Sequence, residues 1–170
     1  MRITARVDYA VRAALELAAV APEALTAERI ATAQQIPVRF LQAILRDLQG
    51  ARLVASQRGR EGGYRLALPP GEISLARVMR VEQGFLADVR GERPEDLDYP
   101  GPAAALATVW VAARASYRQV LERVTLADVV AGKLPAHVDE LVALEDAWLS
   151  FGDAPSGVST RATAARPERD

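Results

Sequence analysis

Three polar side chains between residues 38 and 49 have the types and spacing that suit the reading of DNA base pairs: Arg39, Gln42 and Arg46. Residues three and four apart lie on one face of an α-helix, so these side chains would form one polar surface. Arg can pair with guanine through two hydrogen bonds, and Gln can do the same with adenine. An ordinary helical hairpin with a solvated polar face would show the same pattern, because such short patterns are degenerate.

A second basic group lies in the segment that follows, residues 53–68. A β-prone piece, Leu53–Gln57, precedes a glycine cluster, and alternating apolar residues then indicate a second strand. Three glycines can supply the turn of this hairpin: Gly59, Gly62 and Gly63. Three arginines lie on it: Arg58, Arg60 and Arg65. A basic hairpin directly after a candidate recognition helix is typical of the wing of a winged helix-turn-helix, which contacts phosphates or the minor groove. A glycine-rich surface loop with incidental arginines is the alternative, and the preceding helix pair favours the wing.

Residues 26–54 must hold the first group on a helix. Thr26 is a predicted N-cap, Gln34 and Gln35 make the turn, and Pro37 opens the second helix. Apolar residues at helical spacing predict the buried face of that helix: Phe40, Leu41, Ile44, Leu45 and Leu48. Gly50 suits the left-handed position that ends a helix.

The rest of the chain is predicted to be mainly helical around this unit. A first helix covers residues 4–20, and Ser74 caps a helix from Leu75 to about Glu82, with Phe85 packing back on the domain. Residues 84–102 are charged and rich in Gly and Pro, which indicates a loop. A long helix over residues 103–125 carries a heptad seam: Leu106, Trp110, Ala113, Tyr117, Val120 and Val124. An amphipathic helix follows over residues 135–151.

The predicted fold is therefore mainly α with a small two-stranded β wing. We expect a winged helix-turn-helix domain over residues 1–83, a loop over 84–102, a dimerisation helix with C-terminal helices over 103–151, and a flexible tail over 152–170. The heptad seam favours a homodimer, although a helix packed inside its own domain would also be apolar.

Charge and composition limit the possible functions. Residues 1–68 carry 10 arginines against 6 acidic residues, whereas the remainder is net acidic. A basic front half fits a protein that presents one face to a polyanion. The chain has no cysteine and one histidine, His137, so disulfides and thiolate-ligated metal clusters are excluded, and we predict no metal and no cofactor. Charges interrupt the apolar N-terminus at helical spacing, which favours an amphipathic helix over a signal peptide, and we expect a cytoplasmic location without membrane contact.

These residues resemble the Rrf-two family of bacterial winged-helix transcription regulators. The resemblance rests on MRITARVDYAVRAALELA, VRFLQAILRDLQGARLVAS, RGREGGYRLAL and ISLARVMRVEQG, and it covers roughly residues 1 to 131. It implies a homodimer with long helices crossed between protomers, reading a pseudo-palindromic operator in double-stranded DNA. It also implies these DNA contacts in the second helix: Val38, Arg39, Phe40, Gln42 and Ala43, with Arg46 behind them. Arg58 matches the family's wing arginine, and Tyr64 would anchor the wing.

The sensor region departs from the family. Many relatives hold an iron–sulfur cluster on three cysteines in the loop that corresponds to residues 84–105, and this loop has none. Asp8 stands where some relatives lend a carboxylate ligand, but one carboxylate cannot hold a cluster. The sequence thus resembles a cluster-free branch of the family.

The leading hypothesis is a homodimeric DNA-binding transcription regulator, expected to act as a repressor that responds to a small molecule or a protein partner. The alternative is a protein-interaction module that kept the fold and no longer reads an operator. An enzyme is not predicted, because no nucleophile–base pair, metal set or phosphate loop occurs.

Overall fold

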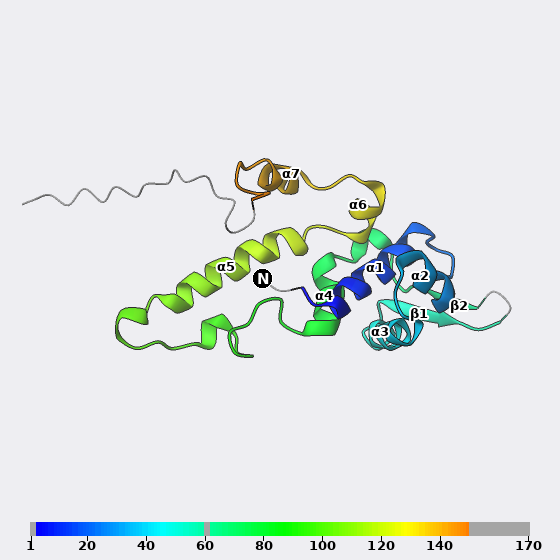
Figure 1. Cartoon of the computed structure of the whole chain (residues 1–170), viewed down its shortest axis with the longest axis horizontal. Coiled ribbons are helices and arrows are strands. Elements are labelled where there is room, and N and C mark those ends of the chain that lie inside the picture. The colour runs from blue at the N-terminus through cyan, green and yellow to red at the C-terminus, as the bar shows by residue number, and fades with distance from the viewer. Residues whose placement is uncertain (1–2, 60–61, 150–170) are drawn as a thin grey trace, which may run out of the picture. The chain divides into compact units, whose positions relative to one another are not determined.

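Three helices, a β-hairpin and a fourth helix form the first part of the chain in the computed structural model, which describes residues 3–59 and 62–149 (Figure 1). The chain divides into two units, residues 1–135 and 136–170. The α-helices of the first unit are α1 (Ala5–Ala19), α2 (Ala27–Gln34), α3 (Val38–Gly50), α4 (Leu75–Gln83), α5 (Leu106–Leu121) and α6 (Leu126–Ala131). Three short 3₁₀ helices lie between them: η1 (Pro70–Glu72), η2 (Pro94–Asp96) and η3 (Gly101–Ala103). The second unit contains α7 (Ala136–Val142).

Hydroxyl side chains cap the N-termini of four of these helices. Thr4, Thr26, Ser74 and Thr125 each accept a hydrogen bond from the backbone N–H three residues further on. Such caps satisfy one of the donors that a helix leaves unpaired at its start. The predicted caps at Thr26 and Ser74 are confirmed.

The hairpin pairs β1 (Val54–Gln57) with β2 (Gly63–Leu66) in antiparallel register, Val54 opposite Leu66 and Gln57 opposite Gly63. Tyr64 also exchanges two backbone hydrogen bonds with Leu25, of 2.8 and 2.9 Å. The base of the hairpin is thereby attached to the segment between α1 and α2, which fixes the direction in which the hairpin leaves the domain.

The core lies between α1, α2, α3, the hairpin and α6. Its fully buried large side chains include Leu17, Ile30, Leu41, Ile44, Leu45, Leu48, Leu53, Ile73 and Leu126. Leu126 belongs to α6, so the chain returns to the winged-helix core after α5. Two backbone bonds of 2.9 Å fasten this return, from Leu75 N–H to the Val124 carbonyl and from Leu126 N–H to the Ile73 carbonyl.

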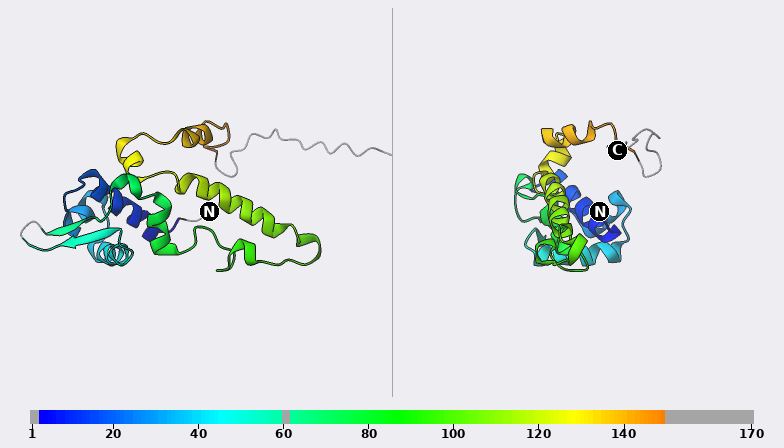
Figure 2. Two further views of the ribbon diagram at one scale, coloured as in Figure 1. Left: turned by 180° about the vertical axis from the view of Figure 1, so that it is seen from behind. Right: turned by 90° about the vertical axis from the view of Figure 1, so that its left-hand side faces the viewer.

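Residues 84–105 run back alongside α5, with η2 packed against it (Figures 1 and 2). Residues 84–102 were predicted as a loop, and this stretch contains η2, the start of η3 and an isolated bridge between Val89 and Glu92. Buried Pro94 and Leu97 hold it in place.

Several local predictions were wrong. Gly50 lies inside α3, and Arg52 adopts the left-handed conformation instead, with φ of 59°. Phe85 is exposed rather than packed on the domain. The helix predicted over residues 103–125 is shorter, because the chain turns after α5 to enter the core, and the last predicted helix ends at Val142.

The predicted tail, residues 152–170, lies outside the described residues. Across the described ranges, none of the helices has the length and apolar character needed to cross a membrane.

Candidate nucleic-acid interface

One face of α3 is buried and the other is exposed and polar. Leu41, Ile44, Leu45 and Leu48 point into the core, each fully buried. The opposite face carries the predicted reading residues Arg39, Gln42 and Arg46, all exposed, with Ala43 half-buried beside them. Val38 is exposed at the first turn. The fold therefore brings the predicted α3 residues onto one accessible surface.

Phe40 was also predicted to lie on the core-facing stripe, and that prediction was wrong. Its side chain is 48% exposed and its ring meets Tyr9 edge-on, with ring centroids 6.2 Å apart. Because Tyr9 comes from α1, the contact seats the first turn of α3 against α1. Phe40 thus remains accessible beside Arg39.

Three arginines of this surface lack an acidic partner within the described ranges. Among the described residues, Arg39, Arg46 and Arg58 form no ion pair with a carboxylate, whereas Arg6, Arg12, Arg80 and Arg114 do. Unpaired guanidinium groups on one surface attract a polyanion and remain free to donate hydrogen bonds to it.

The hairpin presents Arg58 just before its tip. Gly59 has φ of 112°, and its carbonyl accepts a hydrogen bond of 2.9 Å from Gly62 N–H, which closes the turn. At Gly63 an added Cβ would lie 2.4 Å from the Leu25 carbonyl oxygen, so only glycine allows this close approach. The predicted contact Arg60 lies outside the described residues.

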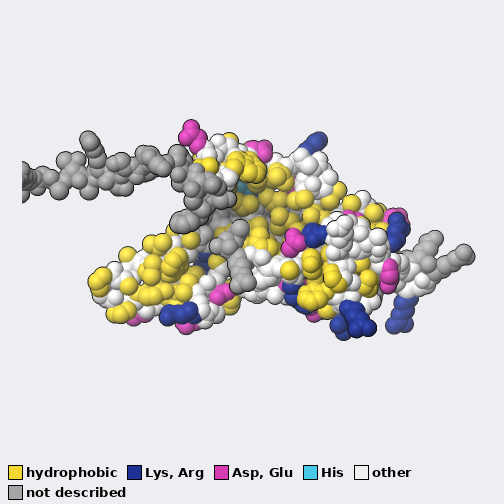
Figure 3. Space-filling view, viewed as in Figure 1, with side chains coloured by type: hydrophobic (Ala, Val, Ile, Leu, Met, Phe, Trp, Pro, Cys, Tyr) yellow, Lys and Arg dark blue, Asp and Glu magenta, His cyan; other side chains and the backbone are white. Residues whose placement is uncertain are grey.

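Space-filling Figure 3 shows arginine side chains gathered around α3 and the hairpin, while hydrophobic side chains cover much of α5. The end of α3 is also tied to the hairpin, because Gln49 Nε2 donates to Ser56 Oγ at 3.2 Å. The two basic elements are therefore held in one relative position.

Arg12 braces the turn between α2 and α3, a role that the sequence did not reveal. Its guanidinium donates to the Gln34 backbone carbonyl and, at 2.8 Å, to Gln34 Oε1. Asp8 accepts a further bond at 3.1 Å, and the guanidinium lies 5.6 Å from the Tyr9 ring centroid. The charges at positions 8, 12 and 16 were a visible signal, but their target depends on tertiary packing.

Arg6 connects α1 to α3 and α4 through ion pairs with Asp47 and Glu82. The Glu82 side chain is only 2% exposed, and its Oε1 has no hydrogen-bond partner among the described residues. Burial raises the pKa of Glu82, and the hydrogen bond from Arg6 opposes that shift. Arg6 thus ties the C-terminal part of α3 to α1 and α4.

The predicted seam on α5 is only partly covered within the protomer. Trp110 is 37% exposed and Ala113 is exposed, whereas Leu106, Tyr117 and Val120 are half-buried. Val109, which lies outside the seam, is 53% exposed. Val124 differs from the prediction: it lies beyond the end of α5 and is 3% exposed, because it packs in the protomer's own core. The accessible seam therefore ends at Val120.

The described residues offer few side chains that could together bind a metal ion. The sequence has no cysteine, and the described residues contain no group of three His, Asp or Glu side chains placed to hold an ion. Asp8 is engaged with Arg12. A thiolate-ligated cluster therefore does not fit the residues present.

Comparison with known proteins identifies the family to which this chain is similar. Residues 3–132 match the model of the Rrf2 family, described as an iron-dependent transcriptional regulator. A protein of Mycobacterium tuberculosis named as an HTH-type transcriptional regulator is 52% identical over 142 residues, covering 83% of this chain and 88% of the relative.

Two solved structures share the fold. The first is CymR, the global cysteine regulator of B. subtilis, with a TM-score of 0.66, 26% identity, and coverage of 78% of this chain and 98% of that one. The second is IscR of T. potens, with a TM-score of 0.64, 27% identity, and coverage of 78% and 88%. These relatives are transcription regulators rather than enzymes.

Proposed function

The chain belongs to the Rrf2 family of DNA-binding transcription regulators, and from this premise we propose that it is a homodimeric repressor that reads a two-fold symmetric operator. The observation that carries the proposal is the exposed Arg39–Gln42–Arg46 face of α3 beside the basic hairpin. In winged helix-turn-helix proteins such a helix enters the major groove and the wing touches the backbone.

The site residues divide by chemistry. Val38, Arg39, Phe40, Gln42 and Ala43 lie at or near the amino end of α3 and would meet base edges, with Arg46 one turn behind. Arg58, together with Arg60, would contact phosphates from the wing, whose turn is formed by Gly59, Gly62 and Gly63. This division predicts different behaviour for the two groups when salt or base sequence is changed.

Dimerisation is supported by the character of α5. Only Leu121 of this helix is buried among the described residues, although the helix is rich in Leu, Val and Ala and contains Trp110. An apolar face of this extent normally packs against a partner. We assign the interface to five seam residues: Leu106, Trp110, Ala113, Tyr117 and Val120. A two-fold axis through it would place two α3 helices in successive major grooves.

Regulation would be independent of an iron–sulfur cluster, because the chain cannot supply thiolate ligands. The signal would instead be a small molecule or a protein partner. A DNA-binding role also supports a cytoplasmic location. Repression follows if the dimer covers a promoter and excludes polymerase.

The test is selection of genomic fragments with the purified full-length protein, repeated with Arg46→Ala and Arg58→Ala. Recovery of an inverted repeat bound at roughly 10⁻⁸ to 10⁻¹¹ M, with affinity that falls as salt rises, is the expected result. Transcription from a promoter carrying that repeat should decrease when the protein is added. No preference over bulk DNA, with cell extract absent or present, would instead favour a protein-interaction module on the same scaffold.

A further inference from the structure

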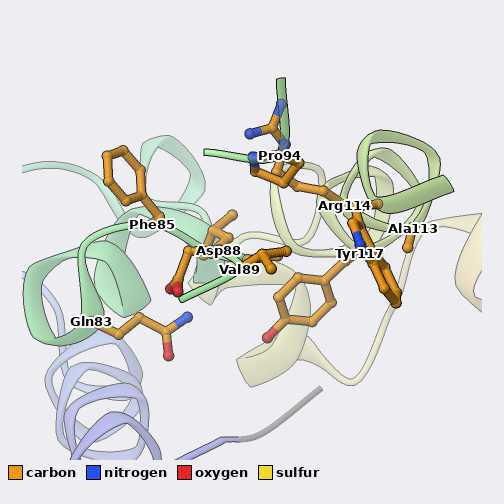
Figure 4. A pocket seen from close by; sticks show the side chains of 11 residues that line it. Gln83, Phe85, Asp88, Val89, Pro94, Ala113, Arg114 and Tyr117 are labelled. Carbon is orange, nitrogen blue, oxygen red and sulfur yellow. The ribbon is translucent and has the colours of Figure 1, made fainter. Parts of the chain in front are cut away.

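A cavity of about 570 Å³ lies between the end of α4, the loop that follows it and α5 (Figure 4). Its wall is mainly apolar and includes Phe85, Leu86, Val89 and Trp110. Figure 4 shows Gln83 and Phe85 on one side and the α5 residues Arg114 and Tyr117 on the other. The volume falls within the range of about 300–1,000 Å³ that is usual for small-molecule sites.

A polar recess of about 170 Å³ adjoins this cavity and shares four of its lining residues: Phe85, Leu86, Ala87 and Arg114. Four arginines line the recess, from α4, the loop and α5: Arg80, Arg93, Arg114 and Arg118. An apolar chamber therefore opens directly into a cationic one. A site of that form suits a molecule with an apolar body and an anionic group.

The four arginines share two carboxylates. Glu95 pairs with Arg93 at 3.2 Å and with Arg114 at 2.5 Å. Glu122 pairs with Arg80 and, at 3.3 Å, with Arg118.

Both carboxylates are already ionised near neutral pH. The hydrogen bond from Arg114 lowers the pKa of Glu95, and that from Arg80 lowers the pKa of Glu122. The four arginines carry four positive charges. Glu95, Glu122 and Asp88, which lines the larger cavity, carry three negative charges, so the site retains one uncompensated positive charge. A bound anion would neutralise that charge.

Arg114 is the side chain best placed to bind that anion. It lines both chambers, and its side chain is only 17% exposed, so its position is restricted. A guanidinium group has five N–H donors, and the ion pair with Glu95 leaves others available. Donors in a partly enclosed site bind an anion more strongly than donors in open water.

We propose that this joined cavity binds a small organic anion, with a ring-sized apolar body against Phe85, Val89 and Trp110 and a carboxylate, sulfonate or phosphate group at Arg114. Trp110, Ala113 and Tyr117 line the cavity and also belong to the seam assigned to the dimer. Occupancy therefore changes the surface against which the partner helix packs. Only this regulatory consequence rests on the proposed function; binding of the anion does not.

The experiment uses 2-naphthoate as the probe and the neutral 2-naphthamide as its matched control, titrated calorimetrically into the full-length protein. The chain has two tryptophans, so in a Trp148→Phe background the fluorescence of Trp110 reports directly on the cavity. We expect naphthoate to bind and to quench Trp110. We expect the amide to bind about tenfold more weakly or worse, because it cannot form the charged pair.

Variants then locate the site. Arg114→Ala should weaken naphthoate binding about tenfold or more, and Arg114→Lys should recover part of the affinity. Ala87→Phe places a large side chain where the two chambers meet and should block binding by volume alone. Arg77→Ala removes an exposed arginine of α4 that lines neither chamber, so it should bind the probe as the unmodified protein does. Circular dichroism checks that each variant is folded.

The proposal is overturned if naphthoate does not bind, if acid and amide bind equally, or if folded Arg114→Ala and Ala87→Phe proteins bind as tightly as the parent. Absence of binding in the dimer would mean that the partner helix fills the cavity. Because probe binding is measured without DNA, it can succeed when operator binding fails, and the reverse also holds. A probe that binds without altering operator affinity overturns the regulatory consequence alone.

Discussion

Under the proposed function, replacing Gln42 or Arg58 by alanine should change DNA binding in different ways, because Gln42 is an uncharged side chain on the exposed face of α3 and Arg58 is a cation on the hairpin. Both side chains are exposed, and in the described part of the chain neither forms a side-chain hydrogen bond or an ion pair. Neither replacement should therefore disturb the fold. Any change in operator binding then reports on the contact with DNA.

The magnitudes follow from the number of contacts. A Gln pairing with adenine discriminates by about 1–3 kcal/mol, so two half-sites lose about 2–6 kcal/mol, or roughly 30-fold to 10⁴-fold in affinity. Gln42→Ala removes no charge and should leave the salt dependence unchanged. Arg58→Ala removes one phosphate contact per protomer, which should make the slope of log K against log salt shallower by about 1.8 for the dimer.

Fluorescence anisotropy measures both quantities, with a labelled operator titrated over a series of salt concentrations and then against operators changed one base pair at a time. Gln42→Ala should relax the preference at one base pair in each half-site. Arg58→Ala should weaken binding to all operator sequences nearly equally. Arg123→Ala is the matched control, since it removes an exposed charge beyond α5. Equal salt slopes for Arg58→Ala and the control, or an unchanged base preference for Gln42→Ala, would refute the assignment of roles.

Three further outcomes test separate parts of the structure. Gly63→Ala forces a Cβ to within 2.4 Å of a backbone carbonyl and should destabilise the protein by about 1–3 kcal/mol, whereas Gly50→Ala, with open space around it, should be neutral or slightly stabilising in thermal melts. Val120→Asp should convert the dimer to monomer in sedimentation velocity, and Ala112→Asp, outside the seam, should not. The folded-state pKa of Glu122 is lowered, so its contribution to stability is present above the unfolded-state pKa and is lost as pH falls through the folded-state value. Glu122→Gln should flatten the loss of stability in that acid range.

Local chemistry explains why much of the fold could be predicted. A hydroxyl before a helix, as at Thr26 and Ser74, acts within three residues, and the structure contains both caps. The hairpin is equally local, because glycine-rich turns and alternating strands specify their own pairing. Residue types and short spacings were therefore sufficient for the helix pair and the wing.

The remaining features depend on contacts between distant segments. The end of α3 was predicted at Gly50, but the left-handed residue is Arg52, since the chain continues two residues before it turns into β1. Val124 fits a heptad pattern, yet the return of the chain to the core buries it. The partner of Arg12 lies 22 residues away, and the cavity joins three segments, so neither is visible in a sequence pattern.

The joint between α5 and the winged domain determines what a bound anion could change. Backbone bonds of 2.9 Å at Leu75 and Leu126 fasten the chain beyond α5 to the start of α4, and Leu126 is fully buried. In the proposed dimer, we infer that this joint would transmit a change in the crossing of the two α5 helices and so alter the spacing of the two α3 helices. Spin labels at Ala51, the exposed residue after α3, should therefore show a shifted distance distribution between protomers when naphthoate binds, and no shift in the Arg114→Ala protein. An unchanged distribution with the probe bound would mean that the cavity and the operator surface are independent.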